Sequence, residues 1–62
     1  MKTAELKKIL KAHGCYFIKQ GSNHEKWFSP GTNHQFQVPR HPTVKRDTAR
    51  EILKEAGIDH RL

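Results

Sequence analysis

Two amphipathic helical segments, one at each end of the chain, enclose a middle part made of β-forming residues and turns. Over residues 3–13, leucine and isoleucine recur at helical spacing, and Gly14 follows as a helix-ending residue. Over residues 46–56 a similar apolar stripe returns, and Gly57 follows it. Short helices are stable in water only when their apolar sides are covered, so both segments must pack against the rest of this small chain.

The middle part contains three β-forming stretches, at residues 15–20, 24–28 and 34–38. The segments between them are rich in glycine, serine, asparagine and proline, which favour tight turns. Strands joined by such short turns pair antiparallel. A chain with the order helix, three strands, helix covers all its apolar sides most economically when both helices lie on one face of the sheet. We therefore predict an α+β fold, built as a single domain over residues 1–62.

Few large apolar residues are available to fill the core of this fold. Phe17, Phe28 and Phe36 are predicted core residues, and Cys15 is predicted to be a small buried strand residue. A lone cysteine forms no internal disulfide, which suits the reducing cytoplasm. The apolar runs are too short to cross a bilayer, so we expect no membrane association.

The chain is strongly basic, with 12 lysine and arginine residues against 6 aspartate and glutamate residues and a formal net charge of +6. This density of positive charge favours a polyanionic partner, which is RNA, DNA or an acidic protein. A surface that serves only solubility is the alternative. The chain has five histidines, but their spacing lacks the pairs that typify zinc sites, so we expect no metal and no other cofactor.

The turn Gly21-Ser22-Asn23-His24 places a histidine at the first position of the second strand. An imidazole can take or give a proton near neutral pH. RNA carries its own nucleophile, the 2′-hydroxyl, so its cleavage needs only a base, an acid and cations for the charge that builds on the phosphate. His24 is therefore the candidate catalytic residue. An ordinary histidine at the edge of a turn is the alternative.

Four further residues are candidates for binding the phosphate of an RNA. Lys26 lies two residues along the strand from His24 and therefore on the same face. Ser22 can donate a hydrogen bond from the turn, and Arg40 and His41 lie in a connection that prolines stiffen on both sides. His41 is also a candidate acid. Ordinary surface roles remain open for each of the four.

Trp27 has two interpretations, because an indole can fill the core or stack on an RNA base. Alternation along the strand puts Trp27 and Phe28 on opposite faces, but a register slip of one residue would exchange them. The sequence therefore leaves open which of the two faces the helices.

Taken together, these motifs resemble the HicA-type toxins, the small mRNA interferases of HicA–HicB toxin–antitoxin systems. The matching stretches are the first helix with its terminal glycine, the Gly-Ser-x-His turn, the Val-Pro-x-His segment and the last helix, at residues 6–14, 21–24, 38–41 and 48–57. The resemblance covers nearly the whole chain. Two positions depart from the pattern of many relatives, since Asn23 stands where they have histidine and Asp47 where they have glycine.

The resemblance implies a fold like that of double-stranded-RNA-binding domains and cleavage of mRNA without a required metal. It also implies a HicB-type antitoxin that covers the active site in a hetero-oligomer. The histidine that ends the family's turn motif, His24 here, is implied to be catalytic. The residues alone leave a non-catalytic RNA-binding module as the main alternative. A DNA-binding protein that uses Arg46, Arg50 and Lys54 is less well supported, because no helix-turn-helix pairing is evident.

Overall fold

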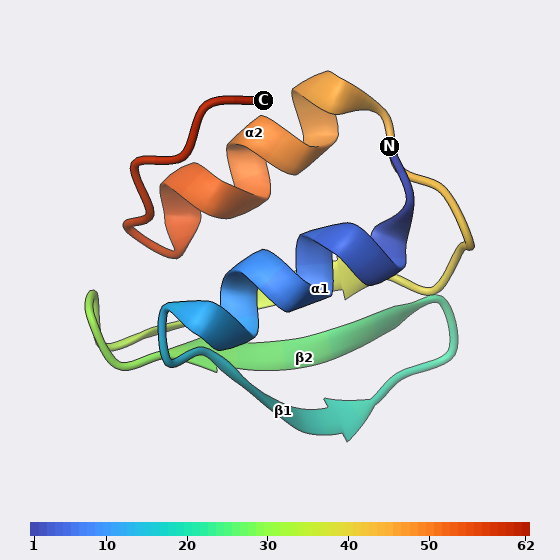
Figure 1. The fold of residues 1–62 in the computed structure, drawn as a ribbon. Coiled ribbons are helices and arrows are strands. Elements are labelled where there is room, and N and C mark those ends of the chain that lie inside the picture. Colours follow the sequence, from blue (N-terminus) through green and yellow to red (C-terminus); the bar gives the residue numbers. More distant parts are fainter.

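The computed structural model describes all residues, Met1–Leu62, and has the element order α-β-β-β-α. The elements are α1 (Thr3–Ala12), β1 (Tyr16–Gln20), β2 (His24–Ser29), β3 (His34–Pro39) and α2 (Arg46–Glu55). The strands form one antiparallel sheet in the order β1-β2-β3, and both helices lie on the same side of it (Figure 1). The predicted α+β arrangement, like that of double-stranded-RNA-binding domains, is confirmed. The first and last residues of each element lie within one residue of the predicted bounds.

The core lies between the two helices and the face of the sheet that they cover. Its buried members come from both helices, from β2 and β3 and from the connections, and they include Leu6, Leu10, Trp27, Phe36, Val38, Ala49, Ile52 and Leu53. Trp27 is only 2% exposed and is the largest fully buried side chain. Since neighbouring strand residues face opposite sides, the burial of Trp27 decides the open question: Trp27 faces the helices and Phe28 faces away from them.

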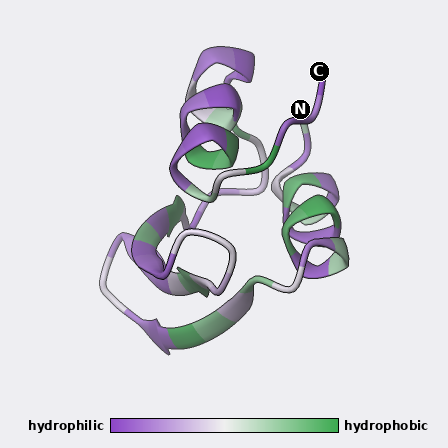
Figure 2. Cartoon of the chain, turned by 90° about the vertical axis from the view of Figure 1, so that its left-hand side faces the viewer, coloured by the Kyte–Doolittle hydropathy of each residue, from purple (hydrophilic) through white to green (hydrophobic).

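The strand β1 is less covered than the sequence predicts. Cys15, just before it, is buried as predicted, and Phe36 on β3 is also a core residue. The core prediction is wrong for Phe17, which is 47% exposed, and for Phe28, which is half-buried on the uncovered face. Phe17 is exposed because β1 is an edge strand that lies away from α2 (Figure 2), and all residues of this strand remain exposed. Phe28 lies on the central strand β2 and faces the side of the sheet without helices.

A β-bulge in β1 changes which of its residues face outward. Tyr16 pairs with Phe28 and Phe17 with Trp27, but the register then shifts, and Lys19 pairs with Lys26. Ile18 is the extra residue in this shift. Because one inserted residue moves all later side chains to the other face, the bulge brings Lys19 to the uncovered side of the sheet.

The connection from β3 to α2 is tied to the start of α1. The backbone N–H of Thr3 donates to the carbonyl oxygen of Pro42 at 3.0 Å, and its hydroxyl donates to the carbonyl oxygen of His41 at 2.5 Å. Val44 and Met1 are joined by a backbone hydrogen bond of 2.8 Å. These bonds fix the path of the proline-flanked segment past the turn between β1 and β2. Neither helix is long and apolar enough to span a lipid bilayer.

Candidate functional site

The turn between β1 and β2 holds the backbone of His24 closely. The N–H of Gly21 donates to the carbonyl oxygen of His24 at 2.7 Å. A Cβ atom added to Gly21 would lie only 2.9 Å from that same oxygen, so any side chain there would push the backbone of His24 away. Glycine at this position therefore fixes where the second strand begins and where the imidazole is attached.

Arg40 clamps the same turn from the end of β3. Its Nη1 donates to the carbonyl oxygens of Gly21 at 3.0 Å and Ser22 at 3.1 Å. With the amide oxygen of Gln20 turned toward the guanidinium, Nη2 donates to that oxygen at 2.6 Å. The backbone N–H of Arg40 donates to the carbonyl oxygen of Asn23 at 3.0 Å. The N–H groups of Arg40, a candidate phosphate-binding residue, are thus directed at the turn, and the positive charge of the guanidinium is held beside the turn.

The side chain of His24 lies at the wall of a polar hollow of about 280 Å³. We call it the turn hollow, and it is lined by Lys19, Gly21, Ser22, Asn23, His24, Glu25, Lys26 and Gln37. Three residues predicted from the sequence, Ser22, His24 and Lys26, therefore meet in one place. The Ser22 hydroxyl makes no hydrogen bond within the protein, and neither lysine forms an ion pair. The turn hollow presents donors and positive charge suited to a phosphate.

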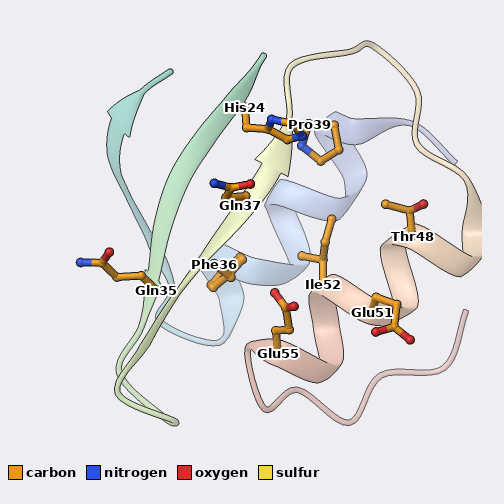
Figure 3. A pocket seen from close by; sticks show the side chains of 9 residues that line it. All are labelled: His24, Gln35, Phe36, Gln37, Pro39, Thr48, Glu51, Ile52 and Glu55. Carbon is orange, nitrogen blue, oxygen red and sulfur yellow. The ribbon is translucent and has the colours of Figure 1, made fainter. Parts of the chain in front are cut away.

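A second hollow, of about 390 Å³, lies between β3 and α2 and also includes His24 in its wall. Figure 3 shows His24 and Pro39 at one end of it, with Glu51 and Glu55 extending from α2. No lysine or arginine lines it. Since carboxylates repel an anion, a phosphate group fits the turn hollow better than this acidic cleft. His24 stands on the boundary between the two.

His41 occupies a different part of the surface. It lines a third hollow together with Lys7, Glu25 and Arg40, and it is exposed there. The structure therefore does not bring His41 into either of the hollows that His24 lines.

Glu25 follows His24 in β2 and secures the strand to the first helix. Its carboxylate accepts hydrogen bonds from Lys7 Nζ at 3.1 Å and from Trp27 Nε1 at 3.0 Å. Burial by itself raises the pKa of Glu25, but the hydrogen bonds from Trp27 and Lys7 and the charges of Lys7 and Arg40 outweigh it and lower that pKa. The carboxylate is thus held ionised, and it fixes the strand segment that carries His24.

Three residues of this region are not predicted from the sequence. Lys19 and Gln37 line the turn hollow, and Glu25 anchors the strand beneath it. The spacing of Glu25 and Trp27, two residues apart on one strand face, was a usable signal. Lys19 gave none, because an unbulged hairpin would turn it to the helix-covered side. Nowhere do three or more histidine, cysteine, aspartate or glutamate side chains gather as metal ligands would.

The fold and the site define a small, basic α+β protein with a histidine at the rim of a cationic hollow. A family model described as HicA toxin of bacterial toxin-antitoxin matches residues 3–58. The match includes all five elements and the turn hollow, and the chain belongs to this family. It is the toxin of a toxin–antitoxin system, and membership implies an antitoxin partner. Comparisons with curated proteins and with solved structures gave no significant match.

Proposed function

We propose that this toxin is an endoribonuclease that cleaves mRNA without a metal ion, acting in the cytoplasm as a single domain over residues 1–62. The observation that carries the proposal is the placement of His24, a proton-transfer group fixed by its turn, on the wall of a hollow that holds two unpaired lysines. Proton transfer beside concentrated positive charge is what cleavage of a phosphodiester by its own 2′-hydroxyl requires.

In the proposed reaction the 2′-oxygen attacks the neighbouring phosphorus while the bond from phosphorus to the 5′-oxygen breaks. His24 acts in acid–base catalysis, either taking the proton of the 2′-hydroxyl or giving one to the departing 5′-oxygen. Lys26 and the hydroxyl of Ser22 bind the phosphate oxygens as negative charge develops on them. Arg40 adds its charge and holds the turn. His41, in its separate hollow, provides a contact to a phosphate farther along the strand.

We further propose that the antitoxin is of the HicB type and covers the turn hollow in a hetero-oligomer. A partner that carries carboxylates would complement the formal net charge of +6 and occupy the place of the phosphate. Inhibition and substrate binding would then be mutually exclusive.

The decisive experiment compares His24→Ala with His34→Ala, which removes another exposed strand histidine far from the turn hollow. Each antitoxin-free protein is incubated with labelled mRNA in EDTA, after circular dichroism has shown that it is folded. We expect His24→Ala to lose at least ~100-fold in cleavage rate, because general acid–base catalysis contributes that much, while His34→Ala retains its activity. Full cleavage by folded His24→Ala would overturn the assignment of His24.

The same assay separates the enzyme from a non-catalytic RNA-binding module, which the fold and charge also suit. A gel shift of the mRNA by wild-type protein with no fragments after long incubation would support the module. Cleavage that disappears in EDTA and returns with a divalent cation would contradict the metal-independent mechanism.

A further inference from the structure

The uncovered face of the sheet, which we call the open face, carries an ordered set of side chains. Its members on β1 and β2 are Tyr16, Lys19, His24, Lys26 and Phe28. Tyr16 and Phe28 lie opposite each other, with ring centroids 5.5 Å apart and planes inclined at 44°. Tyr16 is 53% exposed, the highest value among the large hydrophobic residues of the chain. An aromatic pair made of an exposed tyrosine and a half-buried phenylalanine suggests a ligand with flat, apolar surfaces.

Beyond the aromatic pair, positively charged side chains extend along the open face toward His24, the candidate catalytic residue. The next pair across the two strands is Lys19 and Lys26, and His24 follows at the start of β2. Like charges placed directly opposite each other destabilise a sheet, and a bound anion relieves that repulsion. Phe28 lies four positions beyond His24, which corresponds to ~13 Å along a strand. A short stretch of nucleic acid can therefore reach from the rings to the imidazole.

We propose that the open face binds single-stranded RNA, with bases stacked on Tyr16 and Phe28 and the backbone crossing Lys19 and Lys26 to bring one phosphate to His24. This inference rests on the proposed function, since it assigns the substrate's path into the same site. Stacking requires bases whose faces are free, and a duplex conceals them. The open face would therefore select unpaired segments of an mRNA.

Two other occupants fit the open face less well. A second copy of this chain would bring two formal net charges of +6 together and would place the two lysine pairs opposite each other, so the copies would repel. An antitoxin protein could cover the rings, but the row of lysines leading to His24 matches the phosphates of a strand that must reach that residue. RNA accounts for the aromatic pair, the lysine pair and their alignment together.

The test uses the His24→Ala protein, so that RNA is bound without being cut. Fluorescence anisotropy measures its affinity for a labelled single-stranded RNA and for a duplex containing the same sequence, with Tyr16→Ala, Tyr16→Phe or Ile18→Ala added. Ile18 is the matched control, because it is an exposed apolar residue of the same strand without an aromatic ring. We expect Tyr16→Ala to weaken single-strand binding about tenfold, while Tyr16→Phe, Ile18→Ala and all duplex affinities stay nearly unchanged.

Equal affinities of the parent and Tyr16→Ala for the single strand would overturn the inference, as would an equal loss for the duplex. A Tyr16→Ala protein that binds RNA normally but no longer binds the antitoxin would also overturn it and assign the face to the protein partner. The proposed function fails in a different way. A wild-type chain that binds single strands through Tyr16 yet cleaves none would leave this inference standing and refute the nuclease.

Discussion

The two faces of the sheet differ in how far their side chains are buried and in whether their polar groups have partners. On the face that the helices cover, Trp27 and Phe36 are buried, and the polar side chains among them all have partners. Ser29, for example, donates its buried hydroxyl to the carbonyl oxygen of Ala56 at 2.7 Å. On the open face, Tyr16 is in contact with water and two lysines stand opposite each other without a carboxylate.

In a chain of 62 residues, this contrast separates the face that stabilises the fold from the face that is free to bind a ligand. A domain this small has little apolar surface to bury, so every large residue left outside reduces its stability margin. Covered side chains have their partners inside the molecule. The open face combines exposed rings with unpaired cations, which is the composition of a surface that meets a ligand. Substitutions on the two faces should therefore affect different properties.

The largest effect is expected on the covered face. Trp27→Ala should destabilise the fold by ~3–5 kcal/mol, because it removes the largest buried side chain and leaves a cavity. A chain of this length has only ~3–9 kcal/mol in total, so much of the protein should unfold near room temperature. Urea denaturation followed by circular dichroism measures this, with Tyr16→Ala, expected to cost about 1 kcal/mol or less, as the open-face comparison. Equal losses would contradict the division between the faces.

An intermediate effect is expected from Glu25, which ties the covered face to α1. Its pKa is lower in the folded chain than its ordinary value of 4.5, so its stabilising contribution is fully present above the pKa of the unfolded chain and is lost as pH falls through the folded value. Glu25→Gln should cost about 1 kcal/mol at neutral pH and should reduce the loss of stability in acid. Urea titrations between neutral pH and pH ~3 measure this.

Glu55→Gln is the matched control for that titration, because Glu55 is exposed and forms no ion pair. It should follow the wild-type curve. If Glu25→Gln loses stability in acid as steeply as the wild type, the ion pair with Lys7 does not contribute as we infer.

The smallest effect on stability, and one of opposite sign, is expected from Lys19 on the open face. Lys19→Gln removes one of two like charges that face each other and should stabilise the fold by about 0.2–1 kcal/mol, while it weakens RNA binding. Thermal unfolding and anisotropy measure the two quantities on one preparation. Lys8→Gln, at an exposed lysine of α1, is the control. A loss of stability in Lys19→Gln would indicate that the pair is not repulsive.

Local patterns in the sequence were sufficient for the elements and for part of the site. Gly14 and Gly57 mark the helix ends, and both have the positive φ that favours glycine there, +85° and +72°. The spacing of His24 and Lys26 placed them on one strand face, and both line the turn hollow. The assignment of Phe17 and Phe28 to the core was wrong, because hydrophobicity alone reveals neither that β1 lies at an edge nor which face of the central strand β2 the helices cover.

Short-range patterns were enough to predict the order of elements, the basic charge and the histidine at the corner of a hairpin, since helical spacing, turn residues and composition act over short stretches of chain. The three-dimensional fold was needed to establish that Trp27 faces inward, that Arg40 clamps the turn and that Lys19 joins Lys26 on the open face. These outcomes depend on strand register, on one bulged residue and on contacts between distant segments. Such features are fixed when the whole sheet pairs and the helices settle on one side of it.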